Sequence, residues 1–428
     1  MDLNAQKARI SGLRRYVAIL GPGLMTGAAD DDPSGISTYS VAGASTGLSM
    51  LWLALLTTPM MAVVQGMCAR IGMVSGKGLA AVLRSHMPAP LLFVVAAMVI
   101  VANTFNIGAD IAGMAASMQM VVGLPILLWV FVFGAALIGI QVFLSYRAFV
   151  RVIKWLCLAL FAYVVTAFVV QPNWKAVLAA AVIPHISFTA EWITTMVAVL
   201  GTTISPYLFF WQSSLMVEDE KALGRTTQTA RRGATANEIR DAHADVNTGM
   251  LFSNIVMFFI IVTTATTIGA HGKHAIATAQ QAAEALRPLA GNFAYLLFTL
   301  GMVGTGLLAV PSLAGSSAYV LADIFRFRQG MDEKPRRAPK FYAAVAAGIA
   351  AGVVMNLAHV DPIKALYWSA VANALASVPL VILVTIVAND KRVMGKWRNS
   401  PIANLWSGLA IVTMTGAAVL LFVYWGKS

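Results

Sequence analysis

Long apolar stretches separated by short polar segments make up most of this chain of 428 residues. An apolar run of about 18 or more residues is long enough to cross a lipid bilayer as a helix. The pattern predicts eleven such spans, at residues 17–46, 51–72, 90–121, 124–143, 149–171, 186–217, 247–269, 292–325, 341–360, 362–388 and 403–425. We therefore expect an all-α membrane protein with eleven transmembrane helices, embedded in a lipid bilayer.

Composition and charge support this class and exclude others. The chain is 59% hydrophobic and 11% charged, whereas soluble domains carry roughly 25% charged residues. Its net charge of +12 does not indicate nucleic-acid binding, because the basic residues lie in alternate polar segments. We assign 25 of the 30 lysines and arginines to one side of the membrane, and the five exceptions are Lys175, Lys273, Arg287, Lys364 and Lys427. This asymmetry predicts a cytoplasmic N-terminus and an outer C-terminus, in what we expect to be a bacterial inner membrane.

Two spans contain interruptions that a simple membrane anchor does not need. "DDDPSG" places Pro33 inside the first span, and "GTTISPYLF" places Pro206 inside the sixth. Proline removes a helix hydrogen bond, so both helices should break there. Matching breaks in two halves point to the binding site of a transporter and fit a five-plus-five inverted repeat. We expect a tail at 1–16, a core at 17–388 with repeats at 17–171 and 186–388, and a loop with an eleventh helix at 389–428.

Three consecutive aspartates adjoin the first break. A carboxylate at the centre of a membrane helix costs about 2.5–3.5 kcal/mol on insertion scales, so these residues require a function. Carboxylate, hydroxyl and carbonyl oxygens suit hard divalent cations. Successive helical residues lie about 100° apart, so the three side chains cannot converge on one ion. We expect Asp32 to bind it directly, while Asp31 and Asp30 lie outside the direct ligands.

Several segments resemble the natural-resistance-associated macrophage protein (NRAMP) family of divalent metal transporters. "GPGLMTGAADDDPSG" resembles the first span of that family, and "LWLALLTTPMMAVVQGMCARIGMVSGKGLAAVLR" its second span and the following loop. "NIGADIAG", "GLLAVPSLAGSSAYVLADIF" and "ANDKRVMG" resemble the third span, the eighth span and the loop after the tenth. The resemblance implies the leucine-transporter fold.

The resemblance also implies a metal site, from which this sequence departs. Asp32 keeps the aspartate of the family, but Gly35 stands at the position of an asparagine ligand. Thr202 takes the position of a carbonyl ligand, and Ser205 replaces a methionine whose sulfur is a ligand. We place Asp31, Asp30 and Ser34 around these four positions. Because a thioether favours softer metals, its loss predicts a hard, wet site. A divergent related branch with a comparable loss carries Mg²⁺, so we expect Mg²⁺, with Mn²⁺ or Fe²⁺ as the alternative.

Proton coupling is the second departure. Asp110 holds the position of a family glutamate on the proton route, but Ile107 replaces its acidic neighbour and Tyr207 a histidine. Asp110 is therefore either a proton site or a structural acid, bonded to neighbours such as Asn103, Thr104 or Asn106.

These observations predict an alternating-access transporter that imports a divalent metal cation as its substrate and has no cofactor. A proton-coupled Mn²⁺ or Fe²⁺ transporter remains an alternative within the class. A cation channel that uses the aspartates as a filter, or a symporter for an organic solute, remains an alternative from another class. The sequence contains no nucleophile–base arrangement, phosphate-binding loop or HExxH motif, so we do not expect an enzyme. It does not indicate an oligomeric state.

Overall fold

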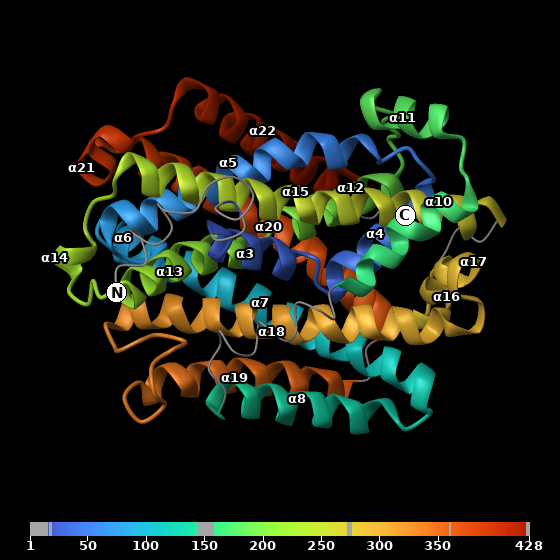
Figure 1. The fold of residues 1–428 in the computed structure, drawn as a ribbon, viewed down its shortest axis with the longest axis horizontal. Helices are drawn as coiled ribbons and strands as arrows, with labels where there is room; N and C mark the ends of the chain where they lie inside the picture. The colour runs from blue at the N-terminus through green and yellow to red at the C-terminus, as the bar shows by residue number, and fades with distance from the viewer. Residues whose placement is uncertain (1–15, 17–18, 144–157, 272–275, 359–360, 425–428) are drawn as a thin grey trace.

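The computed structural model describes Tyr16 and residues 19–143, 158–271, 276–358 and 361–424, and this part of the chain contains helices but no strands (Figure 1). Nine helical stretches in it are long and apolar enough to cross a membrane. Eight stretches are formed by α5 (Trp52–Ser75), α7 (Ala89–Val122), α8 (Ile126–Phe143), α15 (Ala236–Thr267), α18 (Ala294–Phe325), α19 (Pro339–Met355), α20 (Pro362–Asn389) and α22 (Pro401–Tyr424). The ninth is the pair α12 (Ala190–Thr203) and α13 (Pro206–Ala222).

Two of the predicted spans take another form. The first consists of α3 (Pro22–Asp30) and α4 (Pro33–Thr46), each too short to cross a membrane alone. The fifth contains η1 (Leu158–Leu160) and α10 (Phe161–Val170), while the part of this span before residue 158 lies outside the described residues. The count of eleven therefore stays a prediction.

Short helices connect the long ones and gather at the two ends of the molecule. Figure 1 shows α6 (Leu79–Arg84), α14 (Gln228–Arg231) and α21 (Lys391–Met394) at one end. It shows α11 (Trp174–Val182), α16 (Ala279–Ala283) and α17 (Arg287–Ala290) at the other. The charge pattern predicts the first group on the cytoplasmic side and the second outside. The remaining short segments are 3-10 turns, namely η2 (Gly269–His271), η3 (Glu284–Leu286), η4 (Gly291–Phe293), η5 (Asn356–Ala358) and η6 (Gly395–Trp397).

Both predicted helix breaks are present, and proline sets the position of each. Pro33 is the first residue of α4. Asp32 before it has an extended backbone and caps that helix with its side chain. Pro206 is likewise the first residue of α13, with the extended Ser205 before it. Proline is tolerated at a first helical position because the N–H that it lacks would be unpaired there in any case. The breaks leave the carboxyl ends of α3 and α12 facing the amino ends of α4 and α13.

Small residues let the broken helices approach their neighbours closely. A Cβ atom added at Gly27 would lie 2.2 Å from the carbonyl oxygen of Gly249, so α3 packs backbone to backbone against α15. A Cβ atom added at Gly201 would lie 2.0 Å from the carbonyl oxygen of Ala370, which brings α12 equally close to α20. Small residues at helix contacts are typical of membrane proteins.

Large apolar side chains are exposed on the outer helices. Phe131 on α8, Val412 and Phe422 on α22, and Phe168 on α10 are each more than half exposed. Such surfaces suit contact with lipid, whereas the buried core contains most of the polar side chains described below.

Candidate functional site

Asp32 lies at the first break and is almost fully buried, with 2% of its surface exposed. One carboxylate oxygen, Oδ1, accepts a hydrogen bond of 2.7 Å from the backbone N–H of Gly35. The other oxygen, Oδ2, accepts one of 3.2 Å from the side-chain amide of Asn106 on α7. The helix cap therefore fixes the direction of this carboxylate, and a side chain from an unbroken helix meets it.

The two breaks meet at Gly35. A Cβ atom added there would lie 3.3 Å from the carbonyl oxygen of Asp30, 3.4 Å from Oγ1 of Thr202 and 3.5 Å from Oδ1 of Asp32. Three oxygens from both broken helices thus face one point beside a residue without a side chain. The geometry brings together Asp32, Gly35 and Thr202, which the sequence placed in one site.

Ser205 caps the end of α12 with its hydroxyl group. This group lies 2.9 Å from the carbonyl oxygen of Gly201 and 2.8 Å from that of Thr202, and it donates to them. A carbonyl oxygen has two lone pairs, so that of Thr202 can still accept a second partner. The side-chain hydroxyl of Thr202, which the sequence comparison did not single out, lies nearer to Gly35.

Asp30 and Asp31 turn away from Asp32, towards α15. The hydroxyl of Ser253 lies 2.6 Å from Oδ2 of Asp30 and 3.1 Å from Oδ1 of Asp31. The second oxygen of each carboxyl group is buried and has no hydrogen-bond partner among the described residues. Only the backbone carbonyl of Asp30 reaches the group of oxygens at Gly35.

Helix α20 holds both breaks with serine side chains on one face. Ser369 lies 3.1 Å from the hydroxyl of Ser34, which also donates to the carbonyl oxygen of Leu366. Ser377 donates to the carbonyl oxygen of Ile204 at the second break. Asn373 is one helical turn from each serine on the same face, and both polar atoms of its amide are buried without a partner in the described structure. Ser34 thus links the helices and does not point at Asp32.

Asp110 is fully buried on α7, one turn from Asn106. The reading of Asp110 as a structural acid expected hydrogen bonds to its helical neighbours Asn103, Thr104 or Asn106, and the described residues do not contain them. Asn106 instead donates to Asp32, Asn103 to α18 and Thr104 to its own helix. Neither carboxyl oxygen of Asp110 makes a hydrogen bond of good geometry in the described part of the chain, although Asp32 is close enough to interact with it electrostatically.

Tyr207 joins the two broken helices on the other side of the site. Its hydroxyl donates a bond of 2.8 Å to the carbonyl oxygen of Ala29 near the end of α3. This phenol stands where the resemblance implies a histidine, and it holds the position of α3.

The arrangement at the breaks provides oxygen donors and the carboxylate of Asp32, and the carboxyl groups of Asp30, Asp31 and Asp110 lie near enough to interact with it electrostatically. Within the described residues, no three histidine, cysteine, aspartate or glutamate side chains converge on a common point. A cation here would be held by Asp32 together with hydroxyl, carbonyl and amide oxygens. The ends of α3 and α12 add the partial negative charge of helix carboxyl termini.

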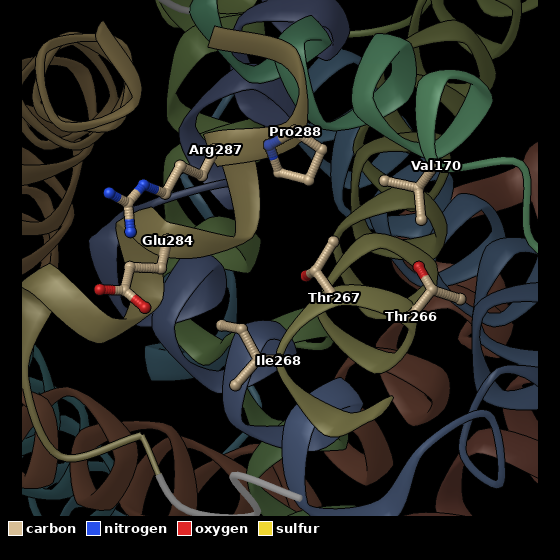
Figure 2. A pocket seen from close by; sticks show the side chains of 7 residues that line it. All are labelled: Val170, Thr266, Thr267, Ile268, Glu284, Arg287 and Pro288. Carbon is tan, nitrogen blue, oxygen red and sulfur yellow. The ribbon is translucent and has the colours of Figure 1, made fainter. Parts of the chain in front are cut away.

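A large cavity lies elsewhere. It has a volume of about 640 Å³ and is lined by Val170 of α10, Thr266 and Thr267 at the end of α15, and Glu284, Arg287 and Pro288 beyond it (Figure 2). Thr266 is 13 residues beyond Ser253 on α15, which corresponds to about 20 Å along the helix. Figure 2 shows the charged ends of Glu284 and Arg287 turned away from the centre of this cavity. We do not assign it to the candidate site.

The sequence did not identify Asn106 as a site residue. The sequence could have identified Asn106 by its position four residues before Asp110, because this spacing puts both side chains on one face of α7. Asn106 and the side-chain hydroxyl of Thr202 are the polar groups near Asp32 and Gly35 that the sequence did not single out.

Comparisons with known proteins agree with this geometry. The profile of the natural resistance-associated macrophage protein-like family matches residues 23–424. The divalent metal cation transporter MntH of Aeromonas hydrophila subsp. hydrophila is 24% identical over 419 residues, covering 95% of this chain and 96% of that protein.

Solved structures show the same fold. A manganese transporter of Eremococcus coleocola, in complex with an aromatic bis-isothiourea compound, superposes with a TM-score of 0.73 and 17% identity, covering 96% of this chain and 88% of that one. Mhp1, a nucleobase-cation-symport-1 family transporter, superposes with a TM-score of 0.57 and 15% identity, covering 95% and 91%. The expected leucine-transporter-like fold, with its five-plus-five repeat and broken first and sixth helices, is confirmed. The chain belongs to the natural resistance-associated macrophage protein family of divalent metal transporters.

Proposed function

We propose that this protein is an alternating-access transporter that carries a divalent metal cation into the cell, bound where the two helix breaks meet. The observation that carries the proposal is Asp32, a buried carboxylate held at the first break and faced by oxygens from both broken helices. Irregular backbone at membrane depth is tolerated where it is buried or lines a cavity. In transporters, such unwound carbonyls and helix carboxyl ends bind the transported cation.

The donors favour a hard cation. Asp32 and Thr202 offer oxygen at the meeting point of the breaks, and the hydroxyl of Ser205 stands where the resemblance implies a sulfur ligand. Oxygen sites suit Mg²⁺ and Mn²⁺. The likeness to the manganese transporter of Eremococcus coleocola supports Mn²⁺, while the missing sulfur favours Mg²⁺. We therefore propose a site that accepts both ions, with Mn²⁺ fitting at least as well as Mg²⁺.

The cytoplasmic route follows from how α3 is held. Asp245 on α15 accepts hydrogen bonds from the backbone N–H groups of Gly21, Gly23 and Leu24, at 2.8, 2.7 and 3.0 Å. These bonds and the close glycine contacts hold α3 against α15. Release of the ion inward would require α3 to separate from α15. The uneven distribution of lysine and arginine along the sequence supports a cytoplasmic N-terminus and an outer C-terminus, and we propose a bacterial inner membrane as the location.

Uptake into proteoliposomes tests the proposal. We expect the wild-type protein to accumulate Mn²⁺ and Mg²⁺ inside the vesicles. Asp32→Asn should reduce uptake to the level of protein-free vesicles, because it removes the only negatively charged ligand that we expect to contact the ion directly. Asp361→Asn makes the same change at the cap of α20 and should leave uptake unchanged. Uptake by Asp32→Asn above half of the wild-type rate would contradict the assignment of the site.

The same vesicles separate the alternatives. A pH-sensitive dye inside them should report no acidification during metal influx, because Ile107 and Tyr207 stand where the resemblance implies the acid and the histidine of a proton relay. Acidification that disappears in Asp110→Asn would instead establish proton coupling. Single-channel current steps would indicate a channel, and metal uptake that requires an organic solute would indicate a symporter.

A further inference from the structure

Asn106 reaches the carboxylate of Asp32 from α7, outside the two broken helices. Its amide nitrogen lies 3.2 Å from Oδ2 of Asp32. Its amide oxygen is buried and has no hydrogen-bond partner among the described residues, and the residue as a whole has no exposed surface. A buried amide oxygen without a partner is unusual in native proteins and calls for an explanation.

We propose that Asn106 is a specificity-determining ligand, whose amide oxygen binds the transported cation opposite Asp32. The inference rests on the proposed function and adds a residue of α7 to its site. Gly35 offers no side chain at the point where the oxygens of Asp30, Asp32 and Thr202 meet. The first span therefore offers no neutral side-chain oxygen at this point. In this proposal, Asn106 supplies that oxygen from α7.

The amide can present either end to the carboxylate. As it lies, the nitrogen donates to Asp32. A half-turn about the Cβ–Cγ bond exchanges nitrogen and oxygen without moving the backbone, and this places the oxygen on the side of Asp32. The amide would then share a cation with the carboxylate, and its N–H groups would turn towards the space that its oxygen occupies now.

The position of Asn106 on α7 suits such a role. Helix α7 runs unbroken over 34 residues and packs against α4, α18 and α20. Ligands on rigid elements hold their geometry better than ligands on loops. An amide oxygen is also a hard donor, so it should favour Mg²⁺ and Mn²⁺ over Cd²⁺.

Three variants of the full-length protein in detergent separate a ligand from a positioning residue. Asn106→Leu removes the oxygen and the N–H donor at similar volume. Asn106→Asp keeps an oxygen but loses the donor. Asn103→Leu is the matched control, because Asn103 is equally buried one turn away and bonds to Leu313 and Ser317 of α18.

The readout is the Kd for Mn²⁺ and Mg²⁺ by titration calorimetry, with folding followed by thermal unfolding. We expect Asn106→Leu to weaken binding roughly tenfold or more, Asn106→Asp to bind at least as tightly as wild type, and Asn103→Leu to leave the Kd unchanged. If Asn106→Asp weakens binding, Asn106 acts only as a hydrogen-bond donor and the inference is wrong, even if the leucine variant does not fold. Unchanged binding in a folded Asn106→Leu would overturn it as well. If the wild-type protein binds neither ion, the proposed function fails first.

Discussion

At the scale of single residues, we propose that the hydroxyl of Ser205 influences which metals the site favours. It caps α12 by donating to the carbonyl oxygens of Gly201 and Thr202. A methionine at this position would bring a polarisable sulfur and lose both bonds. In the proposed site, the side chain that holds the end of α12 therefore also stands at the position expected to affect selectivity.

Ser205→Met should shift the preference of the transporter towards Cd²⁺ and Mn²⁺ and away from Mg²⁺, because a thioether is a soft ligand. Ser205→Ala removes the cap without adding sulfur, so it separates the two effects and should not raise the preference for Cd²⁺. Competition between Cd²⁺, Mn²⁺ and Mg²⁺ for uptake into proteoliposomes measures the order of preference among these ions. If both variants keep the wild-type order, residue 205 does not set selectivity.

At the scale of elements, α3 is the mobile half of the first span in the proposed mechanism. Its amino end is held by the carboxylate of Asp245, as side-chain oxygens hold the amino ends of many helices. A Cβ atom added at Gly249 would lie 2.1 Å from the carbonyl oxygen of Gly23. A single methyl group there should force the two helices apart.

We expect Asp245→Ala and Gly249→Ala to open the cytoplasmic side. Loss of the cap should weaken the attachment of α3 by about 1 kcal/mol, and the added methyl group acts in the same direction by steric contact. The measurement is the rate at which a membrane-impermeant thiol reagent modifies Ala29→Cys in inside-out vesicles, with the native cysteines replaced. Asn237→Ala, at the exposed start of α15, is the control. Modification should be faster in both test variants than in the protein that carries Ala29→Cys alone. An equal or slower rate in both would refute this view of α3.

The sequence predicted the two breaks from Pro33 and Pro206 together with the polar residues beside them. Proline alone does not determine a break, because Pro59, Pro311 and Pro379 lie inside continuous helices.

The sequence could not predict the partners of the polar residues near these breaks. Asp30 and Asp31 bond to Ser253, and Asn106 to Asp32, across more than 70 residues of chain. Helical periodicity placed Asn106 and Asp110 on one face of α7 but did not show which neighbour that face contacts. For that reason the sequence could not show that Asn103, Thr104 and Asn106 bond elsewhere and not to Asp110.

At the scale of the whole molecule, α20 connects the two halves. Ser369 bonds to Ser34 beside the first break, and Ser377 bonds to Ile204 in the second. Movement of either broken helix must therefore break or carry with it a contact to α20. A cation bound by groups from α3, α4, α7 and α12 would link the same elements, which is how binding could be coupled to movement.

The most direct test of this account is to locate the ion. In crystals of the protein soaked with Mn²⁺, the anomalous scattering of manganese should give one peak in the membrane core, at about 2 Å from an oxygen of Asp32. We predict that the hydroxyl or carbonyl of Thr202 and the amide oxygen of Asn106 also lie within coordination distance of this peak. A peak at Asp30, Asp31 and Ser253 instead, or a peak that persists in Asp32→Asn, would contradict the central claim.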